Sequence, residues 1–157
     1  MNAEIRAVTA QDIPTLVPLV EQYWLFEDIP YFDGVRVGRE LARALRDPRL
    51  MSGWIARVRG EAVGYLLSVF VFSLEHLGLT AEIDEFFVLP SARGRGIGDE
   101  LLRLAEAEFA RRGCTNVSLQ LSRGNDRARV FYRAHGYGER AGYDLLDKML
   151  GRSTWPT

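Results

Sequence analysis

The chain has 157 residues, of which 47% are hydrophobic and 26% charged, and its formal net charge is −1. These values are ordinary for a globular protein, so they exclude a disordered or fibrous class and argue against nucleic acid as a partner. The longest apolar stretch, Val63 to Leu74, is shorter than the roughly 20 residues of a spanning helix, and the N-terminal sequence lacks a secretory signal. We therefore expect a cytoplasmic protein that does not contact a membrane.

Residue types that bind metals or form disulfides are scarce. Cys114 is the only cysteine, and His76 and His135 lie far apart in the sequence, so we expect neither an intramolecular disulfide nor a metal site. The length predicts a single domain over residues 1–150. A tail at residues 151–157 follows, in which Trp155 either packs locally or meets another subunit, so a homodimer stays open.

The first half of the chain predicts two helices and four strands. Asp12 is a candidate N-cap, Pro18 is expected to kink the first helix, and Asp47-Pro48 ends the second. Arg59-Gly60 predicts a hairpin turn. In chain order we expect a strand at Ile5 to Val8, helices to about Phe26 and at about Val35 to Leu45, and strands at Trp54 to Val58, Ala62 to Phe72 and Glu82 to Val88.

The second half alternates helices and strands. Gly113 and Gly136 suit the left-handed ends of the two helices. We expect a helix at about Ile97 to Arg112, a strand at Val117 to Leu121, a helix at Asn125 to Ala134 and a final strand at Tyr143 to Leu150. This order implies an α/β (α+β) fold with a mixed central sheet flanked by helices.

Glycine recurs at alternate positions between the strand predicted at Glu82 to Val88 and the helix predicted at about Ile97 to Arg112. Gly94, Gly96 and Gly98 let the backbone approach a ligand closely, and the start of a helix favours negative charge, so the turn predicts an anion site. A dinucleotide-binding fingerprint needs a different glycine spacing and an acid on the next strand, which ends here in Leu119-Gln120-Leu121. A P-loop would need a following Gly-Lys-Ser or Gly-Lys-Thr, which is lacking.

The segment from Val88 to Gly98 resembles the acyl-CoA signature of the GNAT family of N-acetyltransferases, which Arg93, Gly96 and Gly98 carry here. The resemblance implies that the turn binds the pyrophosphate of acetyl-CoA through its six residues, Arg93, Gly94, Arg95, Gly96, Ile97 and Gly98. It also implies that Val88 pairs with the pantetheine arm. The backbone N–H of Val88 or Phe87 is then the donor to the oxyanion.

A second segment, Asn125 to Tyr137, resembles the other coenzyme motif of the same family. Asn125 is a preferred helix N-cap, and the resemblance implies that its amide also reaches the pantetheine. Tyr132 falls at the position of the general acid that protonates the departing thiolate. Transfer is then direct, and Cys114 takes no part.

An ammonium acceptor must lose a proton before it attacks, so a carboxylate is needed as base. Glu82, Asp84 and Glu85 lie on the strand before the turn. Strand alternation places Glu82 and Asp84 on one face and Glu85 on the other, unless a bulge changes the phase. We favour Glu82 and Asp84 as the base over Glu85; pairing with a neighbouring arginine is the alternative for each.

The first helices and their loop cover the acceptor side in the family, and here they are acidic and aromatic. We expect Glu27, Asp28, Tyr31 and Glu85 to bind the acceptor, because acids attract an ammonium and aromatic faces bind cations. The predicted function is acetyl transfer from acetyl-CoA to a small cationic amine. A different acyl group, a protein amine and a noncatalytic acyl-CoA-binding module stay open as alternatives.

Overall fold

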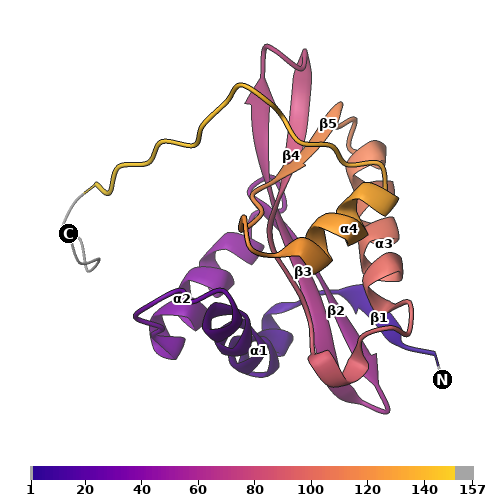
Figure 1. The fold of residues 1–157 in the computed structure, drawn as a ribbon. Coiled ribbons are helices and arrows are strands. Elements are labelled where there is room, and N and C mark those ends of the chain that lie inside the picture. Colours follow the sequence, from indigo (N-terminus) through magenta and orange to yellow (C-terminus); the bar gives the residue numbers. More distant parts are fainter. Residues whose placement is uncertain (1, 151–157) are drawn as a thin grey trace. The chain divides into compact units, whose positions relative to one another are not determined.

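The computed structural model describes residues 2–150, which form two compact units, one up to Gln120 and one from Leu121 onward. The first unit carries most of the regular structure (Figure 1). Its elements are β1 (Glu4–Ala7), η1 (Ala10–Asp12), α1 (Ile13–Phe26), α2 (Gly34–Leu45), β2 (Met51–Val58), β3 (Glu61–Ser73), β4 (Gly78–Val88), η2 (Pro90–Ala92), α3 (Ile97–Arg111) and β5 (Asn116–Leu119). These positions confirm the elements predicted from the sequence up to Leu121, with ends that differ by a few residues.

The five strands form one sheet in the order β1-β2-β3-β4-β5. The first four are antiparallel to their neighbours, and β5 runs parallel to β4. Arg59 and Gly60 both have positive φ, 52° and 83°, which is the conformation of a tight hairpin turn whose twist matches that of the strands. The sheet is therefore mixed, as the sequence predicts.

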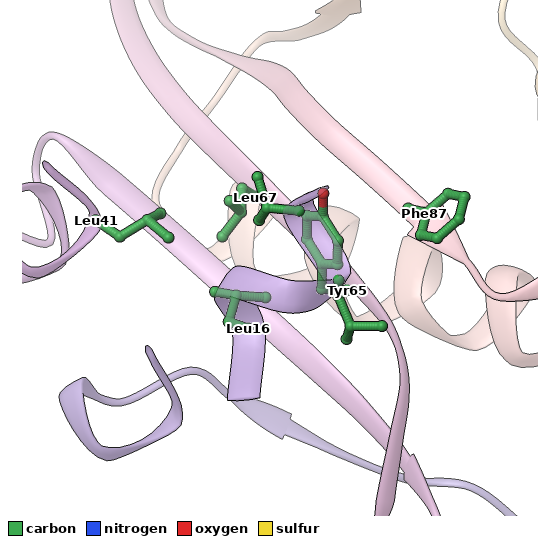
Figure 2. Packing of buried hydrophobic residues seen from close by; sticks show 7 residues of the cluster. Leu16, Leu41, Tyr65, Leu67 and Phe87 are labelled. Carbon is green, nitrogen blue, oxygen red and sulfur yellow. The ribbon is translucent and has the colours of Figure 1, made fainter. Parts of the chain in front are cut away.

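Helices cover both faces of this sheet. Tyr65 and Leu67 of β3 pack with Leu16 of α1 and Leu41 of α2, and Phe87 of β4 joins the same cluster (Figure 2). On the opposite face, the rings of Trp54 and Phe70 meet Phe109 of α3 edge to face at 5.9 Å and 6.0 Å. Successive strand residues point to opposite faces, so each strand contributes to both cores.

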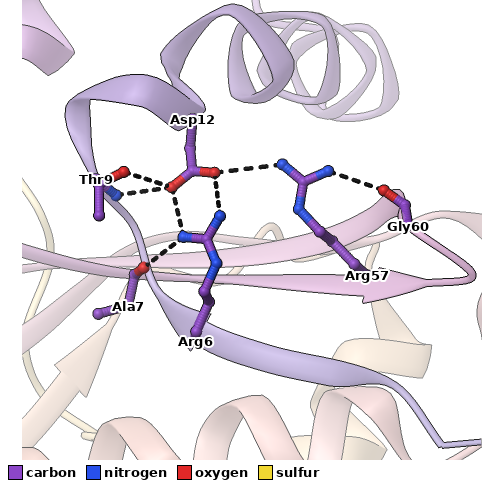
Figure 3. A network of polar contacts seen from close by, with 6 residues as sticks. All are labelled: Arg6, Ala7, Thr9, Asp12, Arg57 and Gly60. Carbon is purple, nitrogen blue, oxygen red and sulfur yellow. Dashed lines mark hydrogen bonds and ion pairs between the residues drawn. The ribbon is translucent and has the colours of Figure 1, made fainter.

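Asp12 does not cap α1 with its side chain, which corrects the prediction from the sequence. Its carboxylate is 3% exposed and accepts hydrogen bonds from Arg6 at 2.6 Å and 2.7 Å and from Arg57 at 3.3 Å (Figure 3). The N–H and hydroxyl of Thr9 donate to it as well, at 2.8 Å and 3.0 Å. A buried carboxylate is stable only when it is paired, so β1, η1 and β2 are held together at this point.

Strand β4 contains a bulge at Asp84. Leu67 of β3 pairs with Glu85 and Ser68 pairs with Ile83, which leaves Asp84 as the additional residue. The pairing of β4 with β5 ends at Ile83, opposite Leu119. The bulge therefore lies where β5 stops accompanying β4, and within the described residues no strand pairs with that edge of β4 from Asp84 to Val88.

The second unit contains one helix, α4 (Asp126–Ala134), as the sequence predicts. Gly136 has a φ of 87°, in agreement with a left-handed end after α4. The predicted final strand is wrong, because residues 143–150 form no strand and most of their apolar side chains are exposed; Leu146 is 90% exposed. Apolar composition favours a strand only where another strand's edge pairs with it.

Residues 151–157, with the predicted tail and Trp155, lie outside the described residues. In the described part of the chain, no helix is both long enough and apolar enough to cross a membrane.

Candidate active site

The glycine turn between β4 and α3 has the backbone conformation that its sequence predicts. Gly94 and Gly96 have φ values of 72° and 75°, and Gly96 is the N-cap of α3. The helix's own hydrogen bonds begin with Glu100 N–H to Gly96 O at 3.0 Å, so the N–H groups of Ile97 and Gly98 precede them. A Cβ at Gly94 would meet no atom within 4 Å, so backbone conformation and access, rather than close packing, favour glycine there.

Arg93 connects this turn to the end of β4 and to α1. Its Nε donates a 2.8 Å hydrogen bond to Val88 O, and its guanidinium lies 5.2 Å from the ring centre of Phe26 and 5.6 Å from that of Phe87. The side chain of Arg95 is exposed. The structure thus brings the predicted coenzyme residues from Phe87 to Gly98 together in one unit, and Arg93 helps to hold their backbone.

Glu85 is held by donors from two other elements. Trp24 Nε1 of α1 donates to its Oε1 and Tyr65 OH of β3 donates to its Oε2, both at 2.8 Å. Burial raises the pKa of Glu85 to about 7; the hydrogen bonds from Trp24 and Tyr65 oppose this, and the charge of Asp84 adds to it. Glu85 therefore changes its charge near neutral pH.

The other two carboxyls on β4 are placed differently. The side chain of Asp84 is exposed, yet the surrounding protein removes enough water to raise its pKa, and the charge of Glu82 raises it further. Glu82 is half-buried and accepts a 3.3 Å hydrogen bond from Gln120 Nε2. Because Glu82 pairs with Val69, two residues beyond Leu67 on β3, the bulge brings it to the same face as Glu85. Strict alternation of side chains along β4 would place Glu82 and Glu85 on opposite faces of the sheet, and the bulge breaks this alternation.

The predicted acceptor-side residues at the end of α1 and in the loop after it differ in exposure. Glu27 is half-buried, and Asp28 and Tyr31 are exposed with positive φ of 54° and 61°. Non-glycine residues rarely adopt this conformation, and such strain is often found at functional loops. Near the end of α1, Trp24 contacts a carboxyl of β4.

Sequence reasoning did not identify Trp24 and Tyr65 as partners of Glu85. Two signals for them exist. The position of Trp24 on the apolar face of α1 directs its indole toward the sheet, and an acid in a central strand requires donors nearby. The register that places Tyr65 diagonally across from Glu85 depends on the bulge, which the sequence does not reveal.

Two predicted site residues, Asn125 and Tyr132, belong to the second unit. Asn125 Oδ1 accepts a 3.1 Å hydrogen bond from the N–H of Ala128, which confirms its role as the N-cap of α4. The ring of Tyr132 lies 5.4 Å from that of Phe131 and 5.4 Å from that of Tyr137. Their roles toward a coenzyme stay predictions.

A cavity of about 550 Å³ lies elsewhere in the first unit, lined among others by Leu45, Met51, Trp54 and Leu104. None of the predicted site residues lines it, and the charged residues that line it are paired, since Glu108 forms ion pairs with both Arg111 and Arg112. We therefore place the candidate site at the end of β4 and not at this cavity.

Comparisons with known proteins indicate the family of this chain. A model described as "Acetyltransferase (GNAT) family" matches residues 16–137. The aminoalkylphosphonate N-acetyltransferase of Salmonella typhimurium is 31% identical over 134 residues, which cover 85% of this chain and 84% of that protein.

Solved structures share the fold. An integron cassette protein from the mobile metagenome of Cole Harbour Salt Marsh has 28% identity and a TM-score of 0.81, covering 95% of this chain and 91% of its own. A predicted acetyltransferase from Clostridium acetobutylicum, solved with acetyl-CoA, has 21% identity and a TM-score of 0.80 over 93% of this chain and 96% of its own.

Proposed function

This chain belongs to the acetyltransferase (GNAT) family and is an acyl-CoA-dependent acetyltransferase, and from that premise we propose that it transfers the acetyl group of acetyl-CoA directly to a small cationic amine. The observation that carries the proposal is the coincidence, at one end of β4, of a bulge, three carboxyls and a glycine turn that opens a helix. An amine acetyltransferase needs a proton acceptor near the thioester and a diphosphate site farther along the coenzyme, and this arrangement supports a proposal for each.

The turn fits the diphosphate of acetyl-CoA. Gly94 and Gly96 have positive φ, and the N–H groups that precede the hydrogen bonds of α3 lie at the positive end of the helix dipole, which suits an anion. The exposed guanidinium of Arg95 adds charge at the rim. Asn125, from the second unit, is proposed to reach the pantetheine.

The proposed reaction forms one C–N bond and breaks one C–S bond. A carboxyl among Glu82, Asp84 and Glu85 takes the proton of the ammonium, and the neutral amine then attacks the thioester carbonyl carbon. The backbone N–H of Phe87 or Val88 donates to the oxyanion that develops. The thiolate leaves and takes its proton from Tyr132. The second proton, which the nitrogen loses as it becomes an amide, restores the phenol of Tyr132.

We propose a cationic amine as the acceptor because acidic and aromatic side chains lie toward the C-terminal ends of β4 and α1. The acids are Glu82, Asp84 and Glu85 on β4, together with Glu27, which directly follows α1 and acts on Tyr23. Trp24 and Phe32, whose rings meet edge to face at 5.5 Å, offer the aromatic surface. The relative from Salmonella typhimurium is named for aminoalkylphosphonates, and this name supports a small amine as the acceptor. A small amine that also carries an anionic group is therefore the second candidate for the acceptor.

A panel of acceptors assayed by release of the coenzyme thiol tests this proposal. Polyamines, aminoglycosides, aminoalkylphosphonates, amino acids and lysine peptides are compared at low and high salt. We expect small cationic amines to react fastest, with kcat/KM falling as salt screens the attraction. The double variant Glu27→Gln with Asp28→Asn should lose part of that salt dependence. Activity confined to acidic or neutral acceptors, or no thiol release with any amine, would contradict the proposal, and the second result would favour a noncatalytic binding module.

A further inference from the structure

Glu85 is the carboxyl of β4 whose two oxygens are both fixed by side chains from outside its own strand. The indole N–H of Trp24 donates to Oε1, and the hydroxyl of Tyr65 donates to Oε2, each at 2.8 Å. Tyr65 is 0% exposed and belongs to the core beneath α1 and α2, so its hydroxyl is carried on a rigid support (Figure 2). Trp24 in turn is held edge to face by Phe32.

This arrangement orients the carboxyl without using all of its capacity. A carboxylate has about four acceptor positions, and the two donors occupy one on each oxygen. Because each oxygen has its own donor, the plane of the carboxyl is fixed. The acceptor positions that Trp24 and Tyr65 do not occupy stay available to a ligand.

We propose that Trp24 and Tyr65 are positioning residues that hold Glu85 as the carboxylate that takes the proton from the ammonium of the acceptor; this inference rests on the function proposed above. The proton passes from the ammonium nitrogen to a free lone pair of Glu85, and the nitrogen lone pair so released forms the C–N bond. Glu82 and Asp84 then supply charge that attracts the cation.

The surroundings of the three carboxyls separate their roles. Asp84 has an exposed side chain at the bulge, and Glu82 is engaged by the amide of Gln120 near the end of β5. Glu85 lies on the side of the aromatic residues of α1, where a small amine has a surface to rest on. It is also the carboxyl that is held on two sides by partners fixed in the core.

Several ionisable groups lie around Glu85. On its own strand, the charge of Asp84 acts on Glu85, and the charge of Glu82 acts on Asp84. The charge of Glu85 acts on the phenols of Tyr23 on α1 and Tyr65 on β3, and Glu27, which follows α1, acts on Tyr23. The pKa values of Tyr23 and Tyr65 are raised, mainly by burial and then by the charges of the nearby acids, so both stay neutral near pH 7. Burial raises the pKa of Glu85, its two hydrogen bonds from Trp24 and Tyr65 lower it, and the charge of Asp84 raises it further.

The dependence of kcat/KM on pH tests the inference. Trp24→Phe and Tyr65→Phe each remove one donor to the carboxylate while keeping an aromatic ring. Since each lost hydrogen bond favours the protonated carboxyl, the acid limb of the profile should move upward by about one pH unit in each variant. Glu85→Gln should lower kcat on the order of 10²-fold or more and abolish that limb.

Tyr23→Phe is the matched control. Tyr23 precedes Trp24 on α1 and packs against Phe87 at 6.0 Å, and the variant keeps that ring contact. If the substitutions acted only by disturbing the packing around α1, the acid limb would move by a similar amount in Trp24→Phe, Tyr65→Phe and Tyr23→Phe. We expect the acid limb of Tyr23→Phe to stay at the parent value.

A readout that needs no turnover keeps the inference separate from the proposed function. Trp24 fluorescence, taken as the difference between the parent and Trp24→Phe, should titrate with a midpoint near the pH at which Glu85 changes charge, and Glu85→Gln should remove that titration. An acid limb unmoved in both donor variants, or a titration that survives in Glu85→Gln, would overturn the positioning role. A titration as expected in a parent protein that acetylates no amine would overturn the transferase proposal and the proton-accepting role with it.

Discussion

Asp12→Asn tests whether the polar network that joins β1, η1 and β2 stabilises the first unit. The variant keeps the size of the side chain but removes its charge, so the guanidinium groups of Arg6 and Arg57 lose their shared carboxylate. An amide also presents N–H groups toward these donors. A hydrogen bond to a charged group is worth about 1.5–3 kcal/mol, and breaking a buried pair costs about 3–5 kcal/mol.

Solvent reduces the expected loss, because 43% of the Arg6 side chain is exposed although Asp12 is only 3% exposed. We therefore expect the free energy of unfolding to fall by about 2 kcal/mol. For a chain of this length that lowers Tm by about 4–8 °C. Thermal and urea unfolding followed by circular dichroism measure both quantities. The matched control is Glu40→Gln, which breaks exposed pairs with Arg39 and Arg43 and should change Tm little.

The same network predicts a pH dependence. Hydrogen bonds from Arg6, then Thr9 and Arg57, hold the pKa of Asp12 well below its usual range, although burial opposes them. The stabilisation is fully present above the unfolded-state pKa of about 4 and is lost as pH falls through the lower pKa of the folded state. The difference in stability between the parent and Asp12→Asn should therefore shrink on acidification below about pH 4. Equal stability of the two proteins at pH 7 would refute the reasoning.

Three further variants probe the site. Gly96→Val should abolish thermal protection by acetyl-CoA, which in the parent amounts to about 2.7 kcal/mol at about 100 times Kd; protection that persists in the variant would contradict the diphosphate site. Tyr132→Phe should lower kcat on the order of 10²-fold with little change in coenzyme Kd by calorimetry, and unchanged turnover would refute the acid role. A Cβ at Gly64 would lie 2.9 Å from Phe87 O, so Gly64→Val should displace the end of β4 and destabilise the protein by about 1–3 kcal/mol in urea unfolding. A variant as stable as the parent would show that this end of β4 moves freely.

The sequence predicts most of the first unit because its signals are local. Helical spacing, the Arg59-Gly60 turn and the alternate glycines after Val88 each act through the conformation of neighbouring residues, and the structure agrees with them. The pairing of Asp12 with Arg6 escaped prediction because an aspartate before a helix has the same local appearance whether it caps or pairs.

Features that depend on pairing between distant segments were harder to foresee. A bulge at Asp84 is set by the register of β4 against β3, and one residue of slip changes which acids share a face. The donors of Glu85 come from residues 20 and 61 positions away in the chain. The predicted strand from Tyr143 to Leu150 failed for a related reason, since apolar composition does not specify a pairing partner.

Mass spectrometry of both protein and acceptor after reaction with isotopically labelled acetyl-CoA tests whether the acetyl group passes directly to an amine. The purified protein is mixed with labelled acetyl-CoA and a small cationic amine, quenched at intervals and analysed. We expect one labelled acetyl group on the nitrogen of the amine, stoichiometric release of the coenzyme thiol, and protein that stays unmodified throughout, including at Cys114. Label on the protein before it appears on the amine, or no labelled amine with any acceptor of the panel, would contradict direct acetyl transfer to an amine.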